Sequence, residues 1–141
     1  MCGLLGEVIF GSESLTPQNK FMTLLNLSRN RGPDSQGYIT NNSSYQFGFN
    51  RLSILDLSDN GNQPIQSASG RYTMVFNGEI YNHEEIRESL PNQKYKFYGN
   101  GDTESLIACF DHFGIEKSVQ KLDGMFAIGI YDSLEKSIHL I

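Results

Sequence analysis

A cysteine at the second position, followed at once by an apolar segment, most constrains how this chain can fold. Residues 1–6 are Met-Cys-Gly-Leu-Leu-Gly, and Leu4 to Phe10 is predicted as a buried strand entered directly from the first residues. Methionine aminopeptidases remove an initiator methionine when the next side chain is small, and cysteine meets that condition. We therefore expect the mature chain to begin at Cys2, which would place a thiol and a free α-amine at the start of a core strand.

Such a terminus favours nucleophilic chemistry. The reference pKa of an α-amine is about 7.7–8.0 and that of a thiol is about 8.5, so the amine can accept the thiol proton near neutral pH. The alternative is an incidental cysteine close to a start codon. Position alone does not separate these two interpretations.

Composition indicates a globular domain and excludes several classes of partner. A chain of 141 residues with 38% hydrophobic and 19% charged residues is expected to form one domain. The net charge of −5, without a basic cluster, argues against nucleic acid or an anionic membrane as the main partner. The longest apolar stretch, Met125 to Tyr131, is too short to span a bilayer, and no secretory signal is visible.

The cysteines and histidines indicate neither disulfides nor a metal site. Cys2 and Cys109 do not make a disulfide framework, so a reducing cytoplasm is the expected location. The three histidines are scattered without the spacing of metal ligands. Cys109 lies on the apolar face of a predicted helix, where we expect it to be buried and inert.

Periodicity predicts several strands with a few helices between them. Helices are expected to begin at Thr16-Pro17, at an Asn82/Glu85 capping box and at Asp102, the last with an apolar face of Leu106, Cys109, Phe110 and Phe113. Further strands are expected over residues 45–49 (half-buried), 51–55, 72–76, 125–131 and 137–141. This pattern is typical of an α+β sandwich of mostly antiparallel sheets.

Five segments are more polar and glycine-rich than packing requires. They are Met-Cys-Gly at 1–3, Arg-Gly-Pro-Asp at 31–34, Arg-Leu-Ser-Ile at 51–54, Asn-Gly-Glu-Ile-Tyr-Asn at 77–82 and Gly-Asp-Thr-Glu at 101–104. In this order they closely resemble the glutaminase domain of glutamine-hydrolysing asparagine synthetases, a class II glutamine amidotransferase domain. The resemblance covers residues 1–141 and implies the Ntn-hydrolase fold, a four-layer αββα sandwich. Pro33 and residues 77–82 favour this subfamily over amidotransferases that make glucosamine phosphate or phosphoribosylamine.

The resemblance implies a catalytic role for three residues. Cys2 would attack the side-chain amide of glutamine, giving a γ-glutamyl thioester and ammonia, while the Asn77 side chain and the Gly78 N–H stabilise the oxyanion. Losing one such donor typically costs about 2.7–4 kcal/mol of barrier. Taken alone, Asn-Gly is also typical of a tight hairpin turn. Arg31 is expected to pair with Asp34 or to cover Cys2.

Glutamine is a zwitterion, and the resemblance implies a clamp for both of its charges. Arg51 would bind the α-carboxylate, and Asp102, with Glu79 nearby, would bind the α-ammonium group. The backbone of Ile54 and Leu55 would lie near the substrate, although these side chains are most simply core. Simpler alternatives are a helix cap for Asp102 and a surface position on a strand edge for Arg51.

The family's second half implies a partner for this chain. That half binds ATP and Mg²⁺, activates aspartate and receives the ammonia, so no cofactor or metal is expected in this domain. Its Ser-Gly-Gly-x-Asp-Ser loop is not among these residues. We therefore expect a glutaminase half, truncated or a separate subunit, that acts with an ATP-dependent synthetase domain and, in a full-length enzyme, within a homodimer.

Three points stay open at the level of sequence. The acceptor could be a sugar acid or a peptide instead of aspartate, and the chain could be a non-catalytic module of the same fold. Asn30 and Gly101 stand where the family often has His and Ser or Thr. The second difference removes a hydroxyl beside Asp102.

Overall fold

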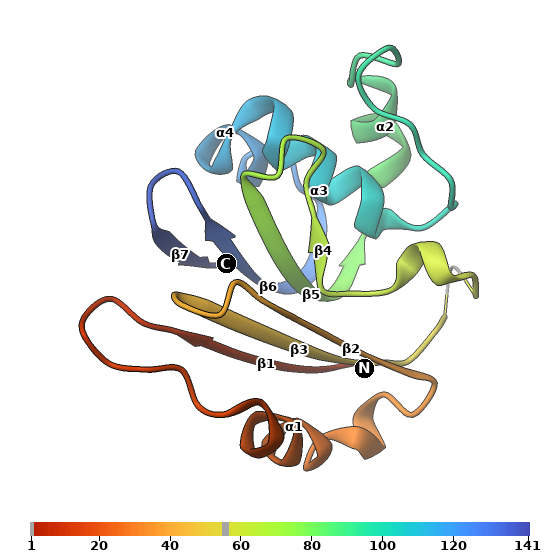
Figure 1. Cartoon of the computed structure of the whole chain (residues 1–141). Helices are drawn as coiled ribbons and strands as arrows, with labels where there is room; N and C mark the ends of the chain where they lie inside the picture. Colours follow the sequence, from red (N-terminus) through yellow and green to blue (C-terminus); the bar gives the residue numbers. More distant parts are fainter. Residues whose placement is uncertain (1, 55–56) are drawn as a thin grey trace.

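Two antiparallel sheets pack face to face between helices in the computed structural model, which describes residues 2–54 and 57–141 (Figure 1). The first sheet has the order β1-β3-β2 and the second β4-β5-β6-β7. Helix α1 covers the outer face of the first sheet, while α3 packs on the second with α2 and α4 beside it. The expected α+β sandwich with αββα layers is confirmed.

The strands of the first sheet are β1 (Gly3–Val8), β2 (Ser35–Thr40) and β3 (Tyr45–Arg51). Those of the second are β4 (Ile65–Gln66), β5 (Tyr72–Ile80), β6 (Gly124–Asp132) and β7 (Ser137–Leu140). The helices are α1 (Gln18–Asn26), α2 (His83–Glu88), α3 (Asp102–Phe113) and α4 (Ile115–Val119), with short 3₁₀ turns at Arg29–Arg31 and Asp59–Gly61.

Strand β3 is buried on both faces, whereas a half-buried strand was expected. Tyr45 and Phe47 pack between the two sheets, where the Tyr45 hydroxyl hydrogen-bonds Thr73 Oγ1 at 2.9 Å. The opposite face lies under α1, because a Cβ on Gly48 would be 2.7 Å from Leu25 Cδ2. The missing side chain at Gly48 lets the helix sit directly on the strand.

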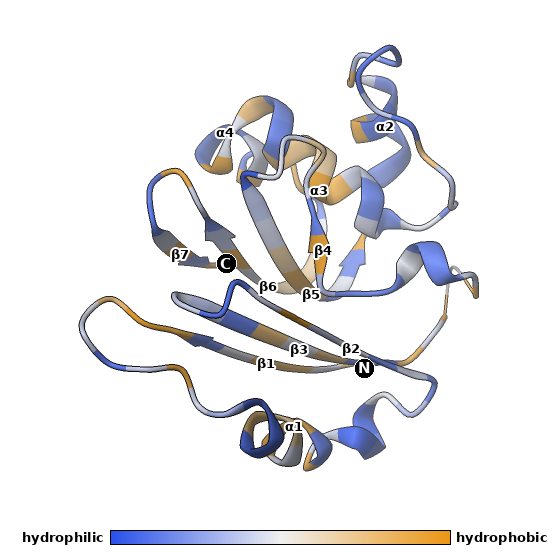
Figure 2. Ribbon diagram, in the orientation of Figure 1, coloured by the Kyte–Doolittle hydropathy of each residue, from blue (hydrophilic) through white to orange (hydrophobic). Residues whose placement is uncertain are grey.

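The second core lies between the β5–β6 pair and helix α3. The two strands pair along their whole length, from Tyr72 opposite Asp132 to Ile80 opposite Gly124. As predicted, α3 buries Leu106, Cys109 and Phe110, with Phe113 partly buried at the edge of the same cluster. In Figure 2, α3 carries hydrophobic colour, whereas α2 is mostly hydrophilic.

The helix starts differ from the predicted caps because the polar side chains have tertiary partners. Pro17 is the N-cap of α1, and Thr16 instead donates from its N–H and hydroxyl to the Glu7 carboxylate at 2.9–3.1 Å. Asn82 makes no side-chain cap bond; its amide bridges the Lys121 C=O and the Asp123 N–H.

Several strand predictions also need correction. β1 ends at Val8 and is a half-buried edge strand, not a buried one running to residue 10. Residues 52–54 are not a strand, because β3 ends at Arg51 and the Ser53 N–H donates to Asp34 Oδ2 at 2.7 Å. The strand expected to stop at residue 76 continues to Ile80. Hydrophobic periodicity did not reveal β2, β4 or α4.

Candidate active site

A cavity of about 450 Å³ opens where the start of β1 meets the last residues of β5. The predicted site residues that line it are Cys2, Arg51, Ile54, Asn77, Gly78, Glu79 and Asp102. Leu55, the remaining predicted contact, lies outside the described residues. Ile54 is 69% exposed, so its interpretation as core is wrong, and it borders the cavity instead.

Cys2 is fixed in this cavity by contacts from three other segments. Its N–H donates to Asn77 Oδ1 at 2.8 Å, which ties the start of the first sheet to β5 in the second. Its Sγ accepts from the Leu52 N–H at 3.3 Å and lies 3.7 Å from the Leu52 C=O. Arg31 Nε donates to the Cys2 C=O at 3.1 Å. Of the two roles expected for Arg31, the structure shows the one in which it covers Cys2.

Strand β5 presents alternate backbone groups to its two edges, as antiparallel strands do. The Tyr81 N–H, just past the strand, bonds the Asp123 C=O toward β6 at 2.7 Å, and the Tyr72 C=O accepts from the Ser67 N–H toward β4 at 2.9 Å. The N–H groups of even-numbered residues therefore face the β4 edge. Because β4 pairs only with Thr73 and Met74, that edge is open beyond them.

Two side chains take the place of β4 along the open edge. Gln63 donates from Nε2 to the Phe76 C=O at 3.0 Å and accepts the Phe76 N–H on Oε1 at 2.6 Å. Asp102 Oδ2 accepts the Ile80 N–H at 3.0 Å. Gly78 lies between these two positions and lines the cavity, and the described residues offer its N–H no side-chain or loop acceptor.

Gly78 is required by the closeness of β6. Its φ is +157°, and a Cβ there would be 2.2 Å from the Met125 carbonyl oxygen and 2.6 Å from Phe126 Cα. Both contacts are with backbone, which cannot rotate away. The hairpin-turn interpretation of Asn77-Gly78 is wrong, because both residues lie within the β5 ladder.

Arg51 is buried at the cavity wall, so its interpretation as a surface arginine is wrong. Its Nη1 donates to the Ser58 C=O at 2.6 Å and to Asn62 Oδ1 at 3.1 Å. Gly61 packs against the guanidinium, since a Cβ at Gly61 would be 2.2 Å from Nη2. The cavity therefore has a fixed positive charge in its wall.

Asp102 places a buried carboxyl group in the same cavity. It is the first residue of α3 and Gly101 is the N-cap, so Asp102 is not a side-chain cap. Burial raises the pKa of Asp102, and the Ile80 N–H and nearby His83 offset only part of that rise. Glu79 is exposed at the rim, and its charge raises the Asp102 pKa further.

Gln63 is the residue in this arrangement that sequence reasoning missed. No motif or periodicity indicated that its side chain bonds the backbone of a strand residue 13 positions further along the chain. Among residues 2–54 and 57–141, no group of three or more His, Cys, Asp or Glu residues could hold a metal ion. No helix within these ranges is long and apolar enough to cross a membrane.

A solved structure identifies the class of fold. Glutamine phosphoribosylpyrophosphate amidotransferase from Bacillus subtilis, complexed with ADP and GMP, aligns with a TM-score of 0.52 and 22% identity. The alignment covers 64% of this chain and 22% of that chain. The two-sheet arrangement is thus the Ntn-hydrolase sandwich.

The glutamine amidotransferase domain family model matches residues 1–141, and the chain belongs to that family. It is 40% identical to asparagine synthetase [glutamine-hydrolyzing] 1 of Bacillus subtilis over 94% of this chain and 21% of that protein. It is 33% identical to asparagine synthetase B of Escherichia coli over 100% of this chain and 24% of that protein. Amidase chry2 of Gibberella zeae is 34% identical over 94% of this chain and 21% of that protein. The resemblance predicted from the motifs is confirmed, and the chain spans about a fifth to a quarter of these relatives' lengths.

Proposed function

We propose that this domain hydrolyses the side-chain amide of L-glutamine through a Cys2 thioester and supplies the ammonia to a synthetase domain. The observation that carries the proposal is the 2.8 Å contact between the Cys2 nitrogen and Asn77 Oδ1. It brings a nucleophile and an amide side chain together beside a strand edge where a backbone N–H faces the cavity. Membership of the amidotransferase family supports glutamine as the substrate.

The first step needs the processed terminus. Once Met1 is removed, the nitrogen held by Asn77 is an α-amine, and it accepts the Cys2 thiol proton. The thiolate attacks the amide carbon of glutamine, forming a carbon–sulfur bond and moving the carbonyl electron pair onto oxygen. Asn77 Oδ1 faces the amine, so its Nδ2 group is left to donate to that oxyanion together with the Gly78 N–H.

The second half of the reaction releases both products. The protonated amine gives its proton to the departing nitrogen as the carbon–nitrogen bond breaks, and ammonia leaves a γ-glutamyl thioester on Cys2. Water then attacks the thioester, the carbon–sulfur bond breaks, and glutamate and the thiol are formed. The domain's own chemistry requires no metal or cofactor at any of these steps.

Specificity for glutamine comes from its two charges. Arg51 supplies the cation for the α-carboxylate, while Asp102 and the rim carboxylate of Glu79 receive the α-ammonium group. A ligand that lacks either charge leaves a buried group of the protein unpaired, and that costs binding free energy.

The fate of the ammonia implies a partner domain. Ammonia released into water at pH 7 is protonated and loses its nucleophilicity, so an enclosed path to an acceptor site is needed. The relatives named asparagine synthetase favour aspartate as the acceptor, activated with ATP in that partner. The relative named amidase chry2 keeps a different acceptor as the second candidate. Asparagine formed from glutamine, aspartate and ATP by this chain with its synthetase domain would decide between them.

Ammonia release from L-glutamine tests the proposal directly. The wild-type protein, shown by mass spectrometry to lack Met1, is expected to form glutamate and ammonia in equal amounts. Cys2→Ala permits the same methionine removal, because alanine is also small, but it lacks the nucleophile and should show no turnover. Cys109→Ala is the matched control, since that buried cysteine lies in the α3 core and its loss should leave kcat nearly unchanged. Equal rates of ammonia release for wild type and Cys2→Ala would refute the proposal.

A further inference from the structure

The Gln63 side chain acts as a missing strand beside the reactive part of β5. Its planar amide offers one donor and one acceptor, the same pair that a neighbouring backbone presents, and it binds both polar groups of Phe76 at 2.6 and 3.0 Å. Gln63 is only 6% exposed, so neither hydrogen bond can be exchanged for water without cost. Phe76 is thereby held as firmly as a residue inside a sheet.

The backbone of Gln63 packs against the other sheet. A Cβ on Gly37 in β2 would be 1.8 Å from the Gln63 carbonyl oxygen, so residue 63 lies directly against the first sheet. Its side chain reaches β5 in the second sheet. Cys2 directly precedes β1 of the first sheet, and Gly78 lies in β5 of the second. Gln63 therefore bridges the two sheets whose relative position sets the distance from the Cys2 sulfur to the Gly78 N–H.

We propose that Gln63 is a positioning residue that aims the Gly78 N–H, and Asn77 with it, at the oxyanion formed on Cys2. This inference rests on the proposed glutamine hydrolysis. Oxyanion donors act only when they lie about 2.7–3.1 Å from the developing charge. Phe76 directly precedes Asn77 and shares an edge of β5 with Gly78, so releasing it loosens both donors without removing either.

Gln63→Met tests this role, because methionine has similar length but cannot make either hydrogen bond. We expect kcat for glutamine hydrolysis to fall about 10- to 100-fold, as for a misplaced catalytic group. KM should change by less than about threefold, because the groups for both substrate charges are unaltered. Gln66→Met is the matched control: Gln66 lies on β4, and within the described residues its side chain makes one long hydrogen bond, from Nε2 to Thr73 Oγ1 at 3.4 Å. That variant should keep wild-type kcat.

Alkylation of Cys2 by iodoacetamide separates positioning from damage to the site. Displacement of iodide forms no oxyanion, so Gln63→Met should be alkylated at Cys2 within about twofold of the wild-type rate. A fall in kcat with unchanged alkylation supports the inference. Unchanged kcat overturns it, and so does a parallel loss of alkylation, which would show that the whole site is disordered.

Gln63→Glu covers the case in which the methionine variant does not fold. The glutamate keeps the size of the side chain and an acceptor for the Phe76 N–H, but its ionised carboxylate replaces the donor to the Phe76 C=O with an oxygen that repels it, so its kcat should also fall below that of wild type. A kcat equal to wild type would overturn the inference. Failure of both variants to fold would assign Gln63 to stability alone. A wild-type protein without glutaminase activity would instead refute the proposed function itself.

Discussion

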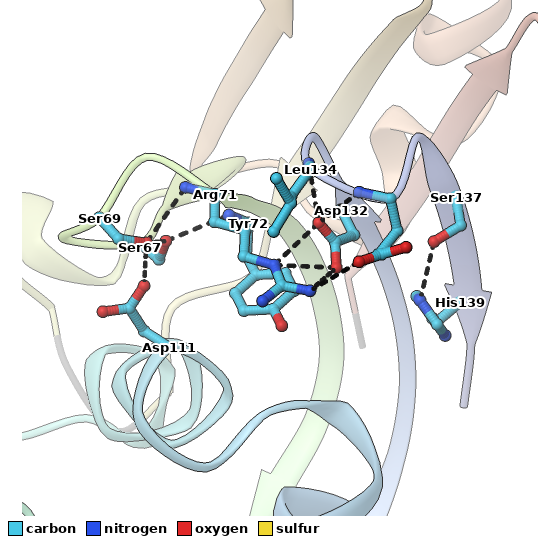
Figure 3. Close-up of polar contacts among 10 residues, drawn as sticks. Ser67, Ser69, Arg71, Tyr72, Asp111, Asp132, Leu134, Ser137 and His139 are labelled. Carbon is cyan, nitrogen blue, oxygen red and sulfur yellow. Dashed lines mark hydrogen bonds and ion pairs between the residues drawn. The ribbon is translucent and has the colours of Figure 1, made fainter.

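The two ends of strand β5 use polar side chains in opposite ways. At the Tyr72 end the polar groups satisfy one another: Asp132 accepts from Arg71 at 2.6–3.0 Å and from the Leu134 N–H at 2.9 Å (Figure 3). Asp111 closes the same end by accepting from Ser69 and from Tyr95. At the Ile80 end, the side chains and the Gly78 N–H face a cavity instead.

Two buried carboxyl groups show what the difference means. Burial alone raises the pKa of Asp132, but the hydrogen bonds from Arg71 and from backbone N–H groups outweigh it, so the pKa is lowered. Burial also raises the pKa of Asp102, and there the backbone N–H groups of Ile80 and of Asp102 itself, together with His83, do not outweigh it. Folding supplies a cation to Asp132 and leaves Asp102 without an equal one. The α-ammonium group of glutamine would supply it.

The largest expected effect that separates the two ends comes from Asn77→Ala. Loss of an oxyanion donor, together with the acceptor that holds the Cys2 nitrogen, should lower kcat at least about 100- to 1,000-fold. The melting temperature should fall only modestly, because the one hydrogen bond lost lies beside the cavity. Steady-state ammonia release and thermal unfolding measure the two quantities.

Thr73→Val is the control for that change, on the same strand and at the other end. Its hydroxyl bonds Tyr45 inside the core, so removing it should lower the melting temperature and leave kcat within about twofold. A large loss of activity in Thr73→Val, or none in Asn77→Ala, would break the distinction between the ends.

Asp102→Asn should change activity less than Asn77→Ala does, and it should weaken glutamine binding while raising stability at neutral pH. The amide can still accept the Ile80 N–H, but it no longer attracts an ammonium group, and KM for glutamine should rise about 10- to 100-fold, the usual range for a lost charge-assisted bond. The folded-state pKa of Asp102 is raised, so the wild-type protein loses stability as pH rises from the unfolded pKa of about 3.9 through the folded value.

The asparagine variant has no such loss, and at neutral pH it should be more stable than wild type. Thermal unfolding at pH 3.5 and pH 7.5 measures the change. A variant that is less stable than wild type at pH 7.5, with an unaltered KM, would contradict both the destabilisation of the ionised Asp102 by burial and its role in binding.

The parts of this molecule that sequence could predict are those recorded in local patterns. The buried face of α3 follows helical spacing, and Cys2, Asn77 and Gly78 follow short motifs whose residues came together at one cavity. Tertiary partners decided what those patterns could not. Thr16 had the chemistry of a cap but bonds Glu7 instead, in keeping with the general override of local preference by tertiary contacts.

Burial of β3 on both faces and the strand-like role of Gln63 were also beyond sequence reasoning. The first depends on helix α1, which packs over Gly48. The alternation of residues within one strand carries no information about such a helix. The second is a bond from a side chain to the backbone, and such bonds have no periodic signature. Strand β4, at Ile65–Gln66, is also too short to give a periodic pattern, and its shortness leaves open the edge of β5 that Gln63 covers.

Asp132→Asn should have the smallest effect and should act on stability alone. The substitution removes a carboxylate bound by Arg71, whose side chain is 36% exposed, so solvent screening reduces the contribution and we expect a loss of about 1–2 kcal/mol in unfolding free energy. The folded-state pKa of Asp132 lies below the unfolded value of about 3.9, so this stabilisation is present above about pH 4 and is lost as pH falls through the folded pKa. The difference between wild type and variant in denaturant unfolding should therefore shrink from pH 7 to pH 3, opposite in sign to the Asp102→Asn difference, while kcat and KM stay at wild-type values. A difference that stays constant with pH would show that packing, and not the ionised carboxylate, holds this end of β5 together.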